Sequence, residues 1–486
     1  MSKFRPPEAY ASRLGTYELL PFRFARMDDD TVVLTNTVGE FAFLRSDKLE
    51  PLVEKRLSPD DEDYVNLRAR HFLREPDDRS PLELLALKLR TRFHRLADFT
   101  NLHLFIVTLR CDHSCPYCQV SRQSEDKAAF DMTKATADKA LDIVFRSPSP
   151  GLKIEFQGGE PLLNFEIIKY IVEQAEARNQ TAGRILQFVC ATTLSLATTE
   201  ILEYFRDHKV IISSSLDGPP DLHDKNRPRA GRNSHAKFVE GLNEAREIVG
   251  WDSVSALMTT TRSSLPRVKE IIDEYVKHGF SSIFLRPLSP YGFAIKTKSF
   301  SAYDADVWFE FYKEGLAYIL ELNKTGIHFV EHYSAIVLKK MLTSNDPGYI
   351  DLMNPSGAGV AAVVFNYDGD VYASDESRML NEMGDSSFRI GNLHTNTYEE
   401  IFTSDNLLTT LEDSFTWSIP GCEQCAFEPF CGADPVFHHA MYGDILGRKP
   451  TSEFCRRNMS IFKHLLRLLR DDSEARAIFI RWANPC

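Results

Sequence analysis

The chain has 486 residues, of which 43% are hydrophobic and 26% charged, as expected for a folded globular protein of about two to four domains. Its formal net charge of −12 argues against a protein that binds duplex nucleic acid, since such proteins usually present a basic face. No apolar run approaches the length of a membrane helix, and residues 1–7 lack the apolar segment of a signal peptide. We therefore expect a cytoplasmic protein with no nucleic-acid and no membrane partner, whose nine cysteines bind metal rather than form disulfides.

Residues 1–99 are predicted to form a small N-terminal α+β unit. Strand-like runs cover residues 20–27, 31–35 and 39–44, and helical patterns begin at residues 46 and 61. Three short strands followed by helices resemble the winged-helix element of peptide-modifying enzymes, which takes up a leader peptide as an extra strand. An arm that packs on the following domain is the alternative.

From residue 102, β-rich runs alternate with amphipathic helical patterns, which is typical of βα units around a parallel sheet. The strand-like runs are residues 102–109, 152–156, 185–190, 210–215, 254–259 and 282–285. Six such units predict an α/β fold, a partial (β/α)6 barrel over residues 100–330. Ligands of parallel βα folds bind at the carboxyl ends of the strands, so we expect the site there.

Three cysteines in a C-x3-C-x2-C pattern follow the first of these strands directly: Cys111, Cys115 and Cys118. A [4Fe-4S] cluster normally takes four thiolates, so a loop with three leaves one iron open for a small molecule. A zinc knuckle or three core thiols is the alternative. The pattern resembles the motif of the radical S-adenosylmethionine (radical SAM) enzymes, in which the open iron binds SAM and an electron from the cluster cleaves it to a 5′-deoxyadenosyl radical.

The second predicted strand ends in a segment that resembles the SAM-binding Gly-Gly-Glu motif of that superfamily. It comprises Gly158, Gly159, Glu160 and Pro161. Two glycines let the backbone approach a ligand closely, and the carboxylate of Glu160 supplies an acceptor for an ammonium group. We therefore expect this segment to bind the amino group of SAM.

Three further residues are predicted to approach SAM from later strands. Ser215 lies in a Ser-x-Asp-Gly segment that resembles the fourth strand of the sulfatase-maturase branch. Arg227 can pair bidentately with the SAM carboxylate, and a solvated surface arginine is the alternative. Thr192 is followed by Thr193, where relatives usually have asparagine, so one SAM contact is either missing or made by a hydroxyl.

Residues 331–486 are predicted to hold a second set of cysteines: Cys422, Cys425, Cys431 and Cys455. Four thiolates complete a closed [4Fe-4S] cluster, and they also suit a structural zinc. The spacing resembles the SPASM domain, the auxiliary-cluster module of peptide-modifying radical SAM enzymes.

A complete SPASM domain binds two auxiliary clusters, but Ser374 and Pro435 stand where ligands of the other one are expected. We therefore predict a single auxiliary [4Fe-4S] cluster. Asp375 matches a position that serves as the substrate base in sulfatase maturases, and a plain turn carboxylate is the alternative. Of the remaining cysteines, Cys190 is expected to be a buried core thiol and Cys486 a loose terminal one.

Residues 20–24, 111–122, 155–165 and 283–292 together closely resemble the B-type radical SAM maturases of His-Xaa-Ser systems (HxsB). The resemblance implies a maturase that abstracts hydrogen from a small partner protein carrying His-Xaa-Ser repeats. It also implies a second radical SAM maturase of the same system and a reductant such as flavodoxin or ferredoxin. Two alternatives remain: a formylglycine-type oxidation of Ser or Cys, and a protein that presents the substrate to the other radical SAM enzyme.

Overall fold

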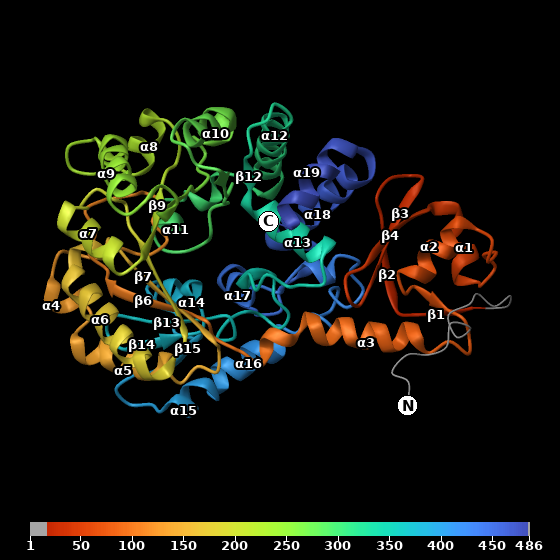
Figure 1. The fold of residues 1–486 in the computed structure, drawn as a ribbon, viewed down its shortest axis with the longest axis horizontal. Coiled ribbons are helices and arrows are strands. Elements are labelled where there is room, and N and C mark those ends of the chain that lie inside the picture. Colours follow the sequence, from red (N-terminus) through yellow and green to blue (C-terminus); the bar gives the residue numbers. More distant parts are fainter. Residues whose placement is uncertain (1–16, 485–486) are drawn as a thin grey trace.

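The computed structural model describes residues 17–484, so the expectations for residues 1–7 and for Cys486 lie outside the described residues. Figure 1 shows the N-terminal unit at one end of the long axis, an α/β region at the other, and the C-terminal helices between them. None of the helices in residues 17–484 is long and apolar enough to cross a membrane.

An eight-stranded sheet forms the centre of the α/β region, in the order β10-β9-β8-β7-β6-β13-β14-β15. Its first five strands are parallel neighbours: β6 (Leu102–Thr108), β7 (Gly151–Gly158), β8 (Ile185–Ala191), β9 (Val210–Ser215) and β10 (Val254–Leu257). These are the first five predicted strands, with small shifts at their ends. Cys190 in β8 is fully buried, which confirms it as a core thiol.

The helices between and directly after these strands bury their apolar faces in the same core as the sheet. They are α5 (Lys134–Val144), α6 (Phe165–Ala182), α7 (Thr199–Asp207), α8 (Pro220–Asn226), α9 (Ser234–Ile248) and α10 (Val268–Lys277). The alternation of strands and helices therefore gives the predicted βα architecture, with its loops at the carboxyl ends of the strands free to carry a site.

The sixth predicted strand does not join this sheet. Only residues 282 and 283 are extended, as β11 (Ser282–Ile283), and they pair with β12 (Val330–Glu331) in a separate two-stranded sheet. The backbone N–H of Arg286 donates to the carbonyl of Phe284 over 2.7 Å, so the chain turns there, and Pro287 has no N–H to continue a ladder.

The sheet is extended instead at its β6 edge, by β13 (Ala362–Phe365), which runs parallel to β6, and by the antiparallel strands β14 (Asp370–Tyr372) and β15 (Arg389–Asn392). The main sheet therefore crosses the boundary that we predicted at residue 330.

The N-terminal unit contains an antiparallel sheet of three strands, β2 (Phe22–Arg26), β3 (Thr31–Asn36) and β4 (Phe41–Arg45). Around it lie β1 (Glu18–Leu19) paired with β5 (Leu73–Arg74), and helices α1 (Ser46–Val53), α2 (Glu62–Ala69) and α3 (Ser80–Arg92). The unit has its own apolar core and contacts the C-terminal region, where the Thr35 hydroxyl donates to the carbonyl of Ala426 over 2.6 Å.

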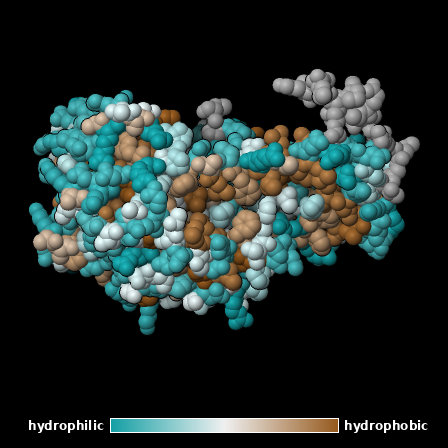
Figure 2. All heavy atoms as spheres, turned by 90° about the horizontal axis from the view of Figure 1, so that it is seen from below, coloured by the Kyte–Doolittle hydropathy of each residue, from teal (hydrophilic) through white to brown (hydrophobic). Residues whose placement is uncertain are grey.

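Four long helices of the C-terminal half pack together beside this unit: α12 (Ala305–Lys324), α13 (His332–Leu342), α18 (Glu453–Asp471) and α19 (Ser473–Ala483). Shorter helices lie between β14 and α18 in the chain: α14 (Asp375–Asn381), α15 (Tyr398–Phe402), α16 (Asp405–Asp413) and α17 (Pro435–Tyr442). On the face seen in Figure 2, apolar side chains gather over the middle of the molecule and the N-terminal unit.

Candidate metal-cluster sites

The loop with Cys111, Cys115 and Cys118 begins three residues after the end of β6, and all three side chains are half-buried. The Arg110 guanidinium fixes the start of the loop by donating to both carboxylate oxygens of Asp131, each over 2.7 Å. At the other end, the N–H of Phe293 donates to the carbonyl of Cys118 over 2.8 Å. The sheet thus presents three thiols at one strand end, where the sequence predicted them.

Burial holds at least two of these thiols in the protonated form. Burial raises the pKa of Cys115 to about 12 and raises that of Cys111 as well, so a metal cluster that bound here would have to displace their protons. Within residues 17–484, the three sulfur atoms do not all lie within 4.8 Å of one another. Thiolates around one zinc ion would be about 3.8 Å apart, given Zn–S bonds of about 2.3 Å.

Gly158 and Gly159 bring the end of β7 against the start of the cysteine loop. A Cβ atom on Gly158 would lie 1.9 Å from the carbonyl oxygen of Thr108, and one on Gly159 would lie 2.1 Å from that of Arg110. Gly158 also has a φ of +145°, which disfavours other residues. Glycine is therefore required at both positions because the backbone passes close to the end of β6 and the loop after it. This contact fixes the cysteine loop relative to β7.

Glu160 is fully buried, and its carboxylate already accepts four hydrogen bonds. The donors are the hydroxyls of Thr192 (2.6 Å) and Thr193 (2.8 Å) and the backbone N–H groups of Leu162 (3.1 Å) and Thr193 (2.8 Å). These occupy all the acceptor positions of a carboxylate. The ammonium contact predicted for Glu160 therefore requires one hydroxyl to move away. Pro161 begins the short helix η3 (Pro161–Asn164) that follows.

Arg227 is not the solvated arginine of our alternative, because its side chain is only 13% exposed. Its guanidinium pairs with Asp217, with 3.2 Å between Nε and Oδ2 and 3.2 Å between Nη2 and Oδ1, and lies over the ring of Tyr117. Tyr117 also donates to Asp217. Arg227 would have to release Asp217 to pair bidentately with the SAM carboxylate. Ser215 ends β9 and is half-buried.

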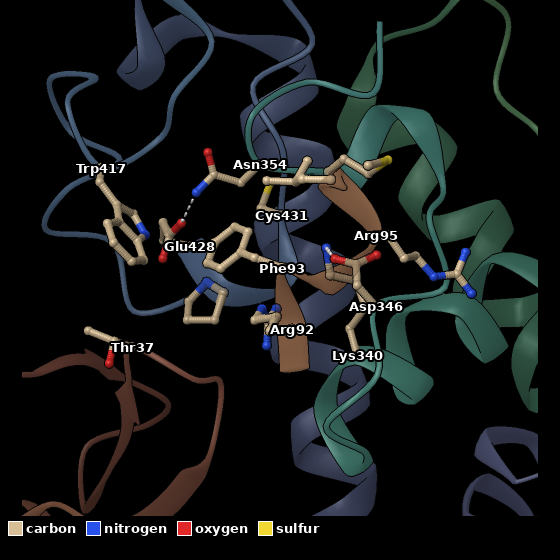
Figure 3. A pocket seen from close by; sticks show the side chains of 13 residues that line it. Thr37, Arg92, Phe93, Arg95, Lys340, Asp346, Asn354, Trp417, Glu428 and Cys431 are labelled. Carbon is tan, nitrogen blue, oxygen red and sulfur yellow. Dashed lines mark hydrogen bonds and ion pairs between the residues drawn. The ribbon is translucent and has the colours of Figure 1, made fainter. Parts of the chain in front are cut away.

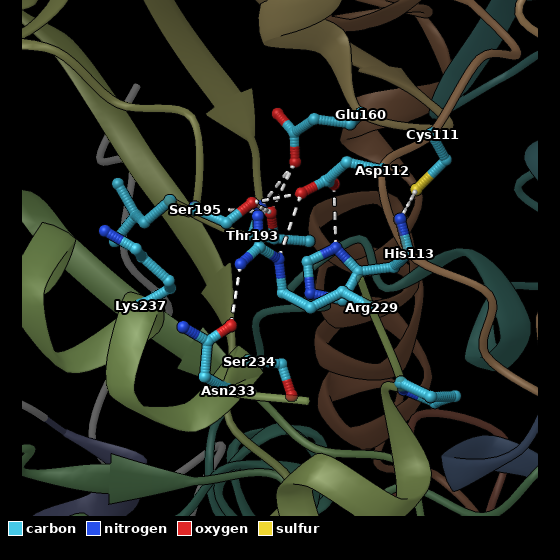
Figure 4. A network of polar contacts seen from close by, with 12 residues as sticks. Cys111, Asp112, His113, Glu160, Thr193, Ser195, Arg229, Asn233, Ser234 and Lys237 are labelled. Carbon is cyan, nitrogen blue, oxygen red and sulfur yellow. Dashed lines mark hydrogen bonds and ion pairs between the residues drawn. The ribbon is translucent and has the colours of Figure 1, made fainter. Parts of the chain in front are cut away.

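A network that the sequence analysis missed joins the cysteine loop to β8 (Figure 4). The carboxylate of Asp112 accepts from the Ser195 hydroxyl over 2.7 Å, contacts Nδ1 of His113 at 2.7 Å, and lies 3.5 Å from Nε of Arg229. The available signal was the Asp-His pair inside the cysteine motif. Its partners lie more than 80 positions away, so spacing alone does not reveal them.

The second set of cysteines lines a single cavity of about 1040 Å³: Cys422, Cys425, Cys431 and Cys455. The other walls are largely apolar, and include Phe24 and Ala25 of the N-terminal unit. Among the described residues, no three of these sulfur atoms lie within 4.8 Å of one another, which is wider than the spacing of about 3.8 Å around a zinc ion. The cavity brings the four cysteines together, and four thiolates suit either a [4Fe-4S] cluster or a zinc ion.

Cys431 also lines a smaller cavity of about 480 Å³, shown in Figure 3. There Glu428 accepts from Asn354 over 3.2 Å, and Lys340 pairs with Asp346 at 3.1 Å. Arg92 of α3 reaches into the same region. The N-terminal unit is therefore joined to the auxiliary cysteines on more than one side.

Ser374 and Pro435 stand at the starts of two helices, at the positions where a second auxiliary cluster would need cysteine ligands. The Ser374 hydroxyl accepts from the N–H of Ser377 over 3.2 Å and so caps α14, and Pro435 occupies the first position of α17. Asp375 begins α14 and accepts from Nε of the fully buried Arg378 over 2.9 Å, a contact that suits a structural carboxylate and leaves its role as a substrate base a prediction. Arg378 also donates to the carbonyl of Val120, two residues after Cys118, over 3.3 Å.

Comparison with known proteins agrees with this geometry. Residues 105–274 match the Radical SAM superfamily. An uncharacterized protein of Methanocaldococcus jannaschii is 27% identical over 190 residues, which is 39% of this chain and 63% of that protein, so the match spans less than two thirds of that relative. The serine-type anaerobic sulfatase-maturating enzyme of Bacteroides thetaiotaomicron is 21% identical over 387 residues, 73% of this chain and 86% of that protein.

Among solved structures, native anSMEcpe with bound AdoMet and Cp18Cys peptide has a TM-score of 0.63 and 18% identity, and the alignment covers 78% of this chain and 99% of that one. This likeness shows a shared fold. Together with the family match over residues 105–274, it shows an α/β radical SAM fold, the kind of fold that binds a [4Fe-4S] cluster and SAM. Residues 105–274 therefore form a radical SAM domain, and the protein is an enzyme with sequence relatives among the anaerobic sulfatase-maturating enzymes.

Proposed function

We propose that this enzyme is a maturase of the HxsB type, which modifies a small partner protein carrying His-Xaa-Ser repeats. The observation that carries the proposal is the loop after β6, where three half-buried thiols adjoin the Gly158–Gly159 turn. The peptide in the anSMEcpe structure supports a peptide substrate. The His-Xaa-Ser partner and the second radical SAM maturase rest on the sequence resemblance.

In this proposal, Cys111, Cys115 and Cys118 hold the cluster that binds SAM. When bound, the cluster and SAM supply a carbon-centred radical that removes a hydrogen atom from a C–H bond of the substrate. The chain contributes position: the bidentate pair of Arg110 with Asp131 anchors the loop. Residues 158–161, Thr192, Ser215 and Arg227 form the SAM side of the site, with Thr192 acting through Glu160.

Cys422, Cys425, Cys431 and Cys455 hold one auxiliary cluster in our proposal. Four thiolates fill every position of a cubane, so the substrate does not bind to its iron. Its role is either to accept an electron from the substrate or to position the peptide. The apolar walls of the cavity restrict the access of water to it.

The N-terminal unit is proposed to bind the leader of the partner protein. β2 and β4 are the edges of its sheet, and an extended peptide can add to such an edge through main-chain hydrogen bonds. Hydrogen exchange of the whole enzyme tests this without truncation. Added partner protein should protect the amides of β2 or β4 and leave those of the distant β15 unchanged; equal exchange everywhere would place recognition outside the unit.

Mass spectrometry of the partner protein, coexpressed with and without this enzyme, tests the function as a whole. We expect a mass change that requires the wild-type enzyme and disappears when Cys111, Cys115 and Cys118 are replaced by alanine. The maturase relatives favour a second candidate, formylglycine formation. Loss of two hydrogens from a serine of a sulfatase peptide, with no change in the repeat protein, would support it. A repeat protein that is modified without the three cysteines would support the presenting role.

A further inference from the structure

A third cavity, partly open to solvent, is lined by residues that neighbour both sets of cysteines along the chain. On one side it is lined by Tyr291, whose chain continues to Phe293, the residue that donates to the carbonyl of Cys118. On the other side it is lined by Arg457, two positions after Cys455. The next residue, Asn458, lies 3.7 Å from the sulfur of Cys431. The cavity therefore adjoins both proposed clusters.

Three carboxylates and two guanidinium groups from separate segments face this cavity: Asp351, Glu376, Asp434, Arg286 and Arg457. Burial raises the pKa of all three acids, and the neighbouring acid Asp351 contributes to the shift of Glu376, whose pKa rises to about 7. Two guanidinium groups can balance only two carboxylates. The third acid has no cation beside it and keeps a proton instead, so a cation that enters the cavity can take the place of that proton.

Two of the side chains that line the cavity also carry polar atoms without hydrogen-bond partners. The Tyr291 hydroxyl and the Trp308 indole N–H belong to side chains that are 1% and 2% exposed, and neither has a hydrogen-bond partner within residues 17–484. A buried donor without a partner costs about 1–3 kcal/mol. Either atom would gain a hydrogen bond from a water or from a polar group of a ligand in the cavity.

Aromatic rings form another wall of the cavity. The ring of Phe284 stacks on that of Tyr333 with 5.6 Å between centroids, and Tyr333 meets Tyr349 edge-on at 6.0 Å. Aromatic faces attract cations, and a cation with N–H groups also donates hydrogen bonds to carboxylates. The indole N–H of Trp308 needs an acceptor, which a cation alone does not provide but a peptide carbonyl does.

We propose that this cavity binds a cationic side chain of the peptide substrate, with a carbonyl of the same peptide accepting a hydrogen bond from Trp308. The cation balances the third carboxylate. The inference rests on the proposed function in that the substrate is a peptide, and in a His-Xaa-Ser repeat the cationic side chain is a protonated histidine.

Small peptide-like probes test the cavity apart from the repeat sequence. N-acetylhistidine methylamide, its lysine counterpart and its glutamine counterpart are titrated into the anaerobic holoenzyme at pH 6, with binding followed by tryptophan fluorescence. We expect the two cationic probes to bind about tenfold more tightly than the glutamine probe, as expected for one charge-assisted contact. Equal affinity of the three probes would overturn the inference.

The variant Glu376→Gln removes the third carboxylate and should abolish the preference for cations. Glu382→Gln is the matched control, because Glu382 is half-buried at the end of the same helix, where it accepts from Gln123 instead of facing the cavity. The control should keep the preference. Should Glu376→Gln lose iron, Asp351→Asn replaces it. A preference that survives both substitutions would contradict the proposal.

The same enzyme is then tested with repeat peptides that carry histidine or glutamine. A cation preference for the probes without modification of any repeat peptide would refute the HxsB function and leave the cavity assignment standing. Modification of the repeat without a cation preference would support the HxsB function and refute the cavity assignment.

Discussion

The two sets of cysteines differ in how the chain builds them and in what surrounds them. Cys111, Cys115 and Cys118 lie within eight residues at the end of one strand, among polar side chains such as Asp112 and Asp217. Such surroundings suit a site that must bind a polar molecule at an open iron position.

The four auxiliary cysteines span 34 residues and come from a loop and from α18. Phe24 and Ala25, about 400 positions earlier in the chain, complete the wall of their cavity. Their surroundings suit a closed, shielded cluster. The comparison teaches that the number of thiols and the polarity around them vary together: the open set lies among polar groups, and the closed set is sheltered by apolar ones.

The largest expected effect separates the sets by iron content. Wild-type enzyme reconstituted without oxygen should hold about eight irons, and the double variant Cys431→Ala, Cys455→Ala about four, because each cubane holds four. Cleavage of SAM without substrate should persist in the variant, because the residues assigned to SAM cleavage lie at Cys111, Cys115 and Cys118. About twelve irons in the wild type would show a further cluster, and zinc with about four irons would show that the auxiliary site binds zinc.

The polar surroundings of the first set can be tested through the buried pair of Asp217 and Arg227. Asp217→Asn leaves a buried guanidinium without its carboxylate, which should lower the free energy of unfolding by about 3 kcal/mol. Anaerobic chemical denaturation measures this. Asp221→Asn is the control, because Asp221 is 71% exposed and pairs with Arg267 at the surface, where ion pairs contribute little. If the two substitutions lowered the free energy of unfolding equally, the buried pair would contribute no more to stability than a surface pair.

The shelter of the auxiliary set can be tested at the wall that the N-terminal unit provides. Arg23 of β2 pairs with Glu428 at 3.0 Å, and its neighbour Phe24 lines the cavity. Replacing Phe24 by aspartate brings charge and water to the cavity, so the auxiliary cluster should be lost several-fold faster in air. Optical bleaching in the triple variant without Cys111, Cys115 and Cys118 isolates this cluster. An unchanged rate would show that the wall does not protect it.

The smallest effect concerns Glu376, which lines the third cavity. Its pKa of about 7 lies above its ordinary 4.5, so the native state holds a proton that the unfolded chain has released. The free energy of unfolding should therefore fall as the pH rises from about 4.5 to 7, and no further above it. Glu376→Gln should reduce this slope in anaerobic denaturation at pH 5 and pH 8. If the wild type and Glu376→Gln showed the same dependence of unfolding free energy on pH, the raised pKa of Glu376 would be contradicted.

The sequence predicts features that depend on local spacing. The cysteine motifs, the Gly-Gly turn and five of the parallel strands were predictable because their signals lie within a few residues. The pairing of Arg227 with Asp217 and the four bonds to Glu160 depend on side chains brought together by the fold. The same holds for β13, which joins the sheet beside β6 although 260 positions separate Leu102 from Ala362.

The acidic cavity gave no signal in the sequence. Its five charged groups lie between residues 286 and 457, and each alone is an ordinary surface type of residue. Only their burial in one place distinguishes them. The sixth predicted strand failed for a local reason, since the turn at Arg286 and the missing N–H of Pro287 end it early.

Reductive cleavage of SAM by the variant in which alanine replaces Cys111, Cys115 and Cys118 tests the central claim most directly. The variant should keep about four irons in the auxiliary set and show one cluster signal by electron paramagnetic resonance. It should form no 5′-deoxyadenosine with dithionite, whereas the wild type does. Formation of 5′-deoxyadenosine at the wild-type rate would contradict the assignment of this loop.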